Sequence, residues 1–285
     1  MGKKARIIMA VNPGVFREFA ASIKLALDGF GIPTEVYENE NDVSYGEHYD
    51  LNFVIKALRD YPEERKITGP KILLGTEELW NRRETGHYDL SRGYDRVLEM
   101  YYENVIIPSG TSNVVYCPVG YSPVWETHLP DVEEDIDILF HGSLTDRRMT
   151  FEKALAEKGY NIIFTCNAYG LERDALIKRS KIVINIKAFD KWSYGPMHCL
   201  PTQANKKFML SEKADGGYGP FRSGIHMQEY DGIPDCLEKV AYWLEHEKER
   251  KEFSISAYED MVKTCDYTEI LREALGPQKR MKALI

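Results

Sequence analysis

The spacing of apolar residues predicts alternating strands and helices from the start of the chain. Residues 6–11 form a short apolar run, a turn follows at residues 12–14, and apolar side chains then recur at helical spacing over residues 16–30. A second extended segment, residues 34–37, comes after a glycine and a proline. This order of strand, helix and strand predicts the first β-α-β unit of a parallel sheet.

The same alternation continues along the chain. Its first half contains a predicted strand at 71–75, a predicted helix at 88–102 and a predicted strand at 113–117. In the second half the predicted strands are 136–141, 161–166, 182–186 and 208–210, and the predicted helices are 147–158, 171–179, 234–246 and one that ends at Ala204. Short apolar strands separated by helices indicate the α/β class with doubly wound sheets.

Length and turn composition predict two domains. The chain has 285 residues, and two domains of about 140 residues would each bury a core of their own. Turn formers and acids gather in residues 118–131, so we place an N-terminal domain at 1–125 and a C-terminal domain at 126–265. For residues 266–285 two interpretations stay open, a helix that crosses back to the N-terminal domain and a helix that packs on its own domain.

Charge, cysteine content and hydropathy narrow the class of protein. The formal net charge is −8 and both halves are net negative, which disfavours a broad nucleic-acid surface. The five cysteines are widely spaced and include no C-x-x-C pair, so we expect neither a disulfide framework nor a zinc site, and a reducing, cytoplasmic location. The first apolar run is too short for a signal peptide, and no segment is long enough to span a membrane.

Candidate binding residues follow the first predicted strand of the second half. Gly142 and Ser143 come directly after that strand, and Arg147 and Arg148 stand at the mouth of the next helix. In a doubly wound sheet this edge offers free backbone N–H groups and a helix N-terminus to phosphate, and arginines there could clamp a diphosphate. The alternative is a glycine turn followed by two solvated arginines.

Polar residues also stand at the ends of other predicted strands. Asn185 and Lys187 alternate around one isoleucine, so both side chains point to one face at the end of a predicted strand. Glu212 ends the next strand, where a carboxylate can accept hydrogen bonds from a ribose diol. Asn12 and Gly14 form a comparable loop in the first half, for which a plain turn is the favoured interpretation.

Several of these segments resemble a known family. The stretches DILFHGSLTDRR, YGLERDALIKRSKIVINIKAF, ANKKFMLSE and GIHMQEYDGIPDCLEKVAYWLEHEKER resemble the donor half of GT-B fold glycosyltransferases, especially small bacterial and phage-type enzymes and the CgeB-like group. The pieces GTEELW, YDRVLEMYYEN and YCPVGYSP resemble the acceptor domain of the same group. The resemblance covers most of residues 70–265. It implies two Rossmann-like domains facing each other across a cleft, and metal-independent sugar transfer from a UDP-sugar or GDP-sugar.

The resemblance also implies roles for particular residues. Cationic side chains would stabilise the departing diphosphate, the candidates being Arg148 and Lys187 with His198 or Arg147. Backbone groups at Tyr169 and Gly170 would meet the nucleobase.

The sequence departs from the family pattern in one helix and the loop before it. His198 stands where many relatives carry arginine, so either the phosphate clamp differs or His198 takes over that task. Pro201 falls where related enzymes often carry a carboxylate, which puts the usual contact to the sugar hydroxyls in doubt. Trp192 and Tyr194 in the preceding loop either stack on a sugar or base or fill a domain interface.

An inverting enzyme would need a general base in the first domain to accept the proton of the acceptor hydroxyl. The candidates after strand 71–75 are Glu77, Glu78, His87 and Asp89. The alternative assigns the two glutamates to a helix N-terminus, where negative charge is favourable, and the histidine to a solvated loop. A retaining enzyme would need no such base, so the stereochemistry stays open.

The acceptor and the oligomeric state are left open by the sequence. A saccharide or other hydroxyl compound is one class of acceptor, and a modified base in DNA, as for phage enzymes, is another. Phosphates of DNA would need a basic patch, for which the candidates are Arg82, Arg83, Arg92, Lys279, Arg280 and Lys282. A non-catalytic two-lobed protein that binds nucleotide sugars is a further alternative.

Overall fold

The computed structural model describes residues 2–56, 61–77, 93–106, 113–189 and 194–276. The chain divides into two compact units. Unit 1 comprises Met1–Val119 and Tyr267–Ile285, and unit 2 comprises Gly120–Asp266. Within the described ranges, no helix combines the length and apolar character needed to cross a membrane.

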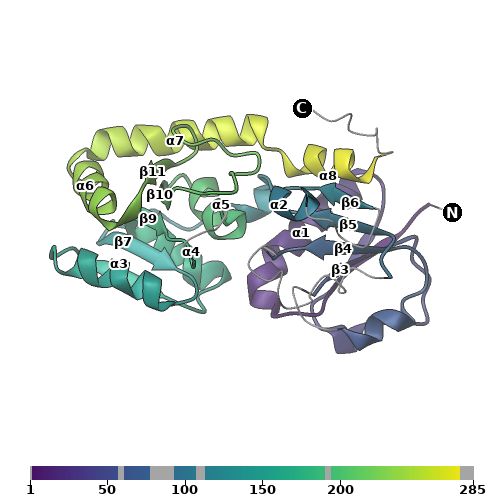
Figure 1. The fold of residues 1–285 in the computed structure, drawn as a ribbon. Helices are drawn as coiled ribbons and strands as arrows, with labels where there is room; N and C mark the ends of the chain where they lie inside the picture. The colour runs from purple at the N-terminus through teal and green to yellow at the C-terminus, as the bar shows by residue number, and fades with distance from the viewer. Residues whose placement is uncertain (1, 57–60, 78–92, 107–112, 190–193, 277–285) are drawn as a thin grey trace. The chain divides into compact units, whose positions relative to one another are not determined.

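Unit 1 contains a six-stranded parallel sheet in the order β2-β1-β3-β4-β5-β6. Figure 1 labels β3, β4, β5 and β6 of this sheet. Its strands are β1 (Ala5–Met9), β2 (Thr34–Tyr37), β3 (Leu51–Ile55), β4 (Lys71–Gly75), β5 (Arg96–Glu99) and β6 (Val114–Tyr116). Its α-helices are α1 (Pro13–Gly29), α2 (Tyr102–Ile106) and α8 (Tyr267–Leu275), with 3-10 turns at Glu40–Asp42 and Pro62–Lys66. All five residues of β1 are buried, as expected for a parallel strand covered on both faces.

The first β-α-β unit has the predicted structure, and local chemistry explains the start of its helix. The Asn12 side chain accepts a hydrogen bond from the Gly14 N–H at 2.9 Å and so caps α1, while Pro13 occupies the first turn. The apolar stripe that predicted α1 is buried. Its Phe19 ring lies 5.9 Å from the ring of Tyr267, where α1 contacts α8.

The predicted helix at 88–102 is wrong over its described part. Residues 96–99 form strand β5, which pairs in parallel with β4 and β6. Tyr94, Val97, Leu98 and Tyr101 recur at helical spacing, but a strand buried on both faces also carries consecutive apolar residues. Strand β3, absent from the predicted elements, is a short apolar segment of the same kind.

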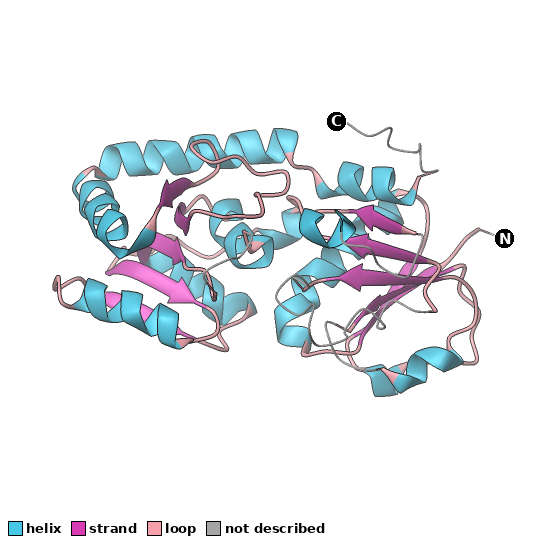
Figure 2. Ribbon diagram, viewed as in Figure 1, coloured by secondary structure: helices cyan, strands magenta, loops and turns pink. Residues whose placement is uncertain are grey.

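Unit 2 contains a five-stranded parallel sheet in the order β11-β10-β9-β7-β8. Its strands are β7 (Ile136–His141), β8 (Ile162–Thr165), β9 (Ser180–Asn185), β10 (Phe208–Glu212) and β11 (Gln228–Tyr230). The α-helices are α3 (Asp146–Ala156), α4 (Gly170–Arg179), α5 (Pro196–Ala204), α6 (Gly232–Glu245) and α7 (Glu247–Thr264), preceded by a 3-10 turn at Pro123–Trp125. Figure 2 shows helices on both sides of the strands of this unit. Helix α3 contacts α6, and α4 contacts α5. The predicted strands and helices of this half are confirmed, and β11 is an addition to them.

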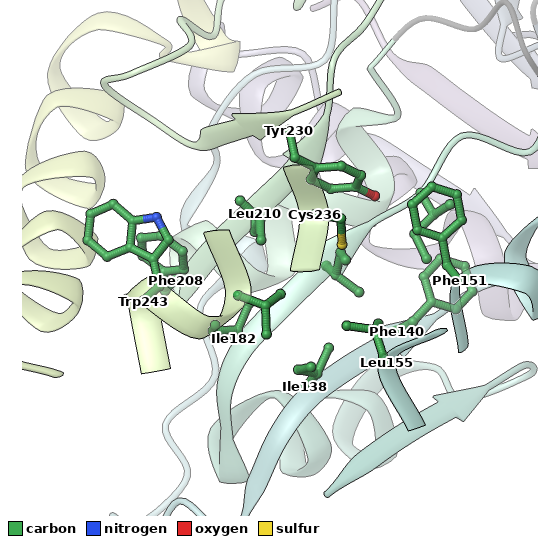
Figure 3. Packing of buried hydrophobic residues seen from close by; sticks show 13 residues of the cluster. Ile138, Phe140, Phe151, Leu155, Ile182, Phe208, Leu210, Tyr230, Cys236 and Trp243 are labelled. Atoms are coloured by element: carbon green, nitrogen blue, oxygen red, sulfur yellow. The ribbon is translucent and has the colours of Figure 1, made fainter. Parts of the chain in front are cut away.

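The core of unit 2 fills the space between its sheet and the helices α3 and α6 (Figure 3). Ile138 and Phe140 of β7 pack with Phe151 of α3, and the Phe208 ring lies 4.6 Å from the Trp243 ring. Each large apolar side chain buried in this way contributes about 1.5–3 kcal/mol. The carboxyl ends of the unit 2 strands are therefore attached to a closely packed core.

The strand order of unit 2 reverses its direction between β7 and β9. From β7 the chain proceeds to β8 on one side, whereas β9, β10 and β11 follow on the other side. The connections that leave the carboxyl ends of β7 and β9 therefore run to opposite sides, and in doubly wound sheets this opens a crevice at those strand ends. Residues 141–143 and 185–187 lie at this point.

Candidate functional site

The turn after β7 has a conformation that favours glycine. Gly142 has φ +148°, in a region where side chains are strained. A Cβ atom there would lie 3.0 Å from Cε1 of His198 and 3.2 Å from Cζ of Phe140. Gly142 therefore lets the β7 strand end approach the first turn of α5 closely.

Arg148 links the ends of β7 and β9. The Arg148 guanidinium donates to the carbonyl of Ser143 at 2.8 Å and to the carbonyl of Ile186 at 2.9 Å, and it stacks over the Phe140 ring. Only 6% of the residue is exposed, and this burial lowers its pKa to about 10. Arg148 is thus a cation at neutral pH whose position is set by two backbone carbonyls.

Two histidines stand beside this arginine. His141 is the last residue of β7 and is 8% exposed, whereas His198 lies in the first turn of α5 and is exposed. Their ring centroids are 5.7 Å apart. Loss of hydration lowers the pKa of His141 well below its usual value, and His198, Arg173 and Arg148 lower it further. His198 keeps exposed surface, but the protein atoms packed around it reduce its hydration and, with Arg148 and Arg173, lower its pKa to about 4.

Both histidines are therefore neutral at pH 7, and two cations lie near them. The described residues provide no hydrogen-bond partner for the His141 ring, although nine-tenths of the residue is buried. Arg173 is itself buried and pairs with Asp174, as expected for a structural arginine. An anion at this point would gain from the cations and would favour protonation of the rings.

The other predicted donor residues form a network around Glu212. Arg147 makes a two-bond ion pair with the Glu212 carboxylate, which is 4% exposed, and donates to the Lys187 carbonyl at 3.0 Å. The Lys187 N–H donates to Glu212 Oε2 at 2.9 Å, while its ammonium group pairs with Asp215. The structure thus gathers these predicted residues, but Arg147 and Lys187 are paired with protein carboxylates.

Two further predicted positions differ in their surroundings. The Asn185 amide donates to the Ser211 hydroxyl at 3.0 Å within the sheet, so its side chain stabilises the strand ends. Tyr169 occupies the N-cap position of α4 without a hydrogen bond from its side chain, and Gly170 follows with φ +53°. The β8–α4 loop follows the carboxyl end of β8, which pairs in parallel with β7.

Two of the positions at which the sequence departs from the family pattern, in α5 and the loop before it, are described by the structure. Pro201 lies inside α5. Tyr194 is buried against Tyr218 and Phe221 and donates to Gln203, so it belongs to the interior of unit 2. Trp192 lies outside the described residues.

In unit 1 the predicted candidates for a base are mostly outside the described residues. These are Glu78, His87 and Asp89, and the same holds for the basic candidates Arg82, Arg83, Arg92, Lys279, Arg280 and Lys282. Glu77 is described, and its carbonyl accepts a hydrogen bond from the Asn104 amide at 2.7 Å. Asn12 and Gly14 form the cap of α1, in agreement with the plain turn.

A buried acid that the sequence analysis missed lies in unit 1. Glu99 ends β5, is 6% exposed and accepts a hydrogen bond from the Asn104 amide at 2.9 Å. Burial raises its pKa to about 7. The signal was present, because a charged residue follows apolar Val97 and Leu98, but the assignment of this segment to a helix concealed a strand end.

The described part of the chain contains no group of three or more His, Cys, Asp or Glu side chains arranged to hold a metal ion. All five cysteines are free thiols, and four of them are buried.

Sequence comparison gives relatives over part of the chain. No known family model matches it. Over 116 residues, 39% of the chain, it is 41% identical to an uncharacterized protein of Acanthamoeba polyphaga mimivirus. The match spans 41% of that protein, so the chain accounts for less than half the length of this curated relative.

Structural comparison extends over nearly the whole chain. The structure of Anabaena HepE in complex with UDP and glucose matches 95% of this chain and 98% of its own, with a TM-score of 0.65 and 12% identity. T4 phage BGT in complex with UDP and Mn²⁺ matches 96% of this chain and 100% of its own, with a TM-score of 0.64 and 10% identity. Both are GT-B glycosyltransferases. The chain therefore has the GT-B fold.

Proposed function

We propose that the protein transfers a hexose from a UDP-sugar to a hydroxyl group of an acceptor. The observation that carries the proposal is the buried His141 ring, which has no hydrogen-bond partner among the described residues and lies beside His198 and Arg148 at the carboxyl ends of β7 and β9. This combination offers hydrogen-bond donors and positive charge to a diphosphate. The complexes of HepE with UDP-glucose and of T4 BGT with UDP support UDP as the nucleotide.

In this proposal unit 2 binds the donor. Arg148, held by two carbonyls, neutralises charge that grows on the diphosphate as the bond to the anomeric carbon breaks, and the two histidines donate hydrogen bonds to the diphosphate. The Glu212 carboxylate, fixed by Arg147, accepts hydrogen bonds from the ribose hydroxyls. Because the ion pair already orients Glu212, ribose binding does not need to order that side chain.

The proposal includes transfer without a protein-bound metal, since the cations named above supply the charge stabilisation. T4 BGT was solved with Mn²⁺ as well as UDP, so metal dependence requires a direct test. The proposal further places the protein in the cytoplasm, where its free thiols stay reduced. Excess EDTA is expected to leave the rate of UDP release unchanged.

Thermal unfolding with nucleotides tests the donor site. At a concentration 100 times its Kd, UDP should stabilise the protein by about 2.7 kcal/mol. His198→Ala should weaken UDP binding at least tenfold, because it removes a group that contacts the diphosphate. The matched control His246→Ala, an exposed histidine after α6, should keep the wild-type affinity.

Three outcomes would count against parts of the proposal. Absence of stabilisation by UDP, GDP and their sugars would contradict a nucleotide-sugar site. Equal loss of affinity in both histidine variants would contradict the location. UDP binding without release of UDP from any UDP-sugar would favour a non-catalytic binding protein.

A further inference from the structure

The carboxyl end of the unit 1 sheet contains one carboxylate in an unusual position. Gly75, Glu99 and Tyr116 end the adjacent strands β4, β5 and β6 and are register partners, so their side-chain positions lie in one row on one face. A Cβ atom on Gly75 would lie 2.2–2.5 Å from the Glu99 carboxylate atoms. The missing side chain of Gly75 is therefore the space that the carboxylate occupies.

The partners of this carboxylate leave part of it free. Asn104 donates to Oε2 at 2.9 Å, and the same amide also donates to the Glu77 carbonyl, which fixes its orientation. In the described portion of unit 1, no protein donor is recorded for Oε1 and no cation pairs with the group. A carboxylate that is 94% buried yet lacks a cation is costly as a structural element alone.

Glu99 changes charge near neutral pH, whereas Tyr116 and Cys117 beside it do not. Burial raises its pKa to about 7, while the bond from Asn104 acts in the opposite direction. The neighbouring groups on packed elements are Glu77 after β4, Glu103 on α2, and Tyr116 and Cys117 on and after β6. Burial raises the pKa of Tyr116 and that of Cys117 to about 12, so neither titrates between pH 5 and 9.

An exposed aromatic group adjoins this row. Tyr102 begins α2, is 46% exposed and meets the Tyr116 ring edge-on at 5.5 Å. Its ring offers an apolar surface, next to the strand end that carries Glu99, for the carbon face of a hydroxylated molecule. Carboxylate, amide and aromatic surface together suit a neutral compound that presents a hydroxyl group.

We propose that Glu99 is the general base of the transfer, accepting the proton of the acceptor hydroxyl, and that the reaction inverts the anomeric configuration. This inference rests on the proposed function. The acceptor oxygen forms a bond to the anomeric carbon as its proton passes to Glu99. The bond between that carbon and the diphosphate oxygen breaks, and its electron pair leaves with UDP. A single displacement of this kind needs one base and no covalent intermediate.

UDP release from UDP-glucose, with water as the acceptor, tests the assignment. Glu99→Gln keeps the shape and should lower kcat at least about 100-fold, the usual range for a lost general base. Its affinity for UDP should stay within twofold of wild type. Wild-type kcat should rise with pH through about 7, and the glutamine variant should lack this rise. Asp95→Asn, an equal charge change at the exposed amino end of β5, is the control.

A second variant separates catalysis from folding. Gly75→Ala keeps the Glu99 carboxyl but displaces it, so kcat should fall while UDP affinity is retained. Rapid proton spectra of the glucose released from UDP-α-glucose should show the β anomer first. Wild-type kcat in Glu99→Gln, or release of the α anomer first, would overturn the assignment of Glu99. Failure of the wild type to bind UDP would instead overturn the proposed function.

Discussion

Among single residues, His141 combines burial with a repulsive electrostatic setting. It is 8% exposed, and burial, His198, Arg173 and Arg148 all disfavour its charged form. A ring kept neutral beside cations stabilises nothing by itself. The free-energy cost of burying this ring beside cations is offset when an anion binds, because protonation of the ring then becomes favourable. The low pKa of His141 in the ligand-free protein is therefore a property expected of an anion-binding site.

This arrangement predicts how stability depends on pH. The pKa of His141 is far below 6.5 in the folded protein and about 6.5 in the unfolded chain. The unfolded state therefore binds an extra proton below pH 6.5, and stability falls as the pH falls from 7 to 5. His141→Gln should reduce this loss by about 2 kcal/mol, as measured by urea unfolding at both pH values.

The control for this measurement is His246→Gln, which alters an exposed histidine at the end of α6. It should show the wild-type dependence on pH. An unchanged loss of stability in His141→Gln would show that His141 is protonated in the folded protein, contrary to the environment described here.

Among elements, the β7–α3 turn shows why a glycine is required. Gly142→Ala would combine a positive φ with a Cβ contact of 3.0 Å to His198. Backbone strain of this kind costs about 1–3 kcal/mol. We expect the variant to lose stability in that range and to bind UDP at least tenfold more weakly, as measured by calorimetric titration, because the strand end and α5 move apart.

Gly159→Ala is the matched control for this prediction. Gly159 follows α3 with φ +81°, and a Cβ atom there meets open space. This variant should lose stability through its backbone alone and keep its UDP affinity. Equal UDP affinities in the two alanine variants would contradict the role of the β7–α3 turn in binding.

The elements also show what sequence patterns can and cannot predict. Apolar runs located β7 and β9 correctly, because buried parallel strands are short and continuous in apolar residues. The same property misassigned β5, whose apolar residues fit a helix equally well, and this concealed Glu99. The Arg147–Glu212 ion pair joins residues 65 positions apart, so only the folded sheet reveals that both predicted donor residues are paired.

On the scale of the whole molecule, the C-terminal helix belongs to the unit that begins the chain. Helix α8 follows unit 2 in sequence but is part of unit 1, where it contacts α1. Leu271 of α8 is fully buried. Leu271→Ala should therefore cost unit 1 about 2–5 kcal/mol, as large apolar side chains removed from a core do.

Native-state hydrogen exchange would locate this loss. Amide protection should fall in α1 and β1, while β7 and β9 of unit 2 keep theirs. Leu25→Ala, on the half-exposed side of α1, should leave protection close to wild type. A loss of protection confined to unit 2 would contradict the assignment of α8 to unit 1.

The central claim is that UDP binds at the carboxyl ends of β7 and β9. The chain has seven histidines, and their ring signals in nitrogen-edited proton spectra report on separate places in the molecule. During titration with UDP, the ring signals of His141 and His198 should shift together. Those of His226, held by Asp260, and of exposed His246 should stay in place. Shifts at His226 or His246 without shifts at His141 and His198, or no shifts at saturating UDP, would contradict the claim.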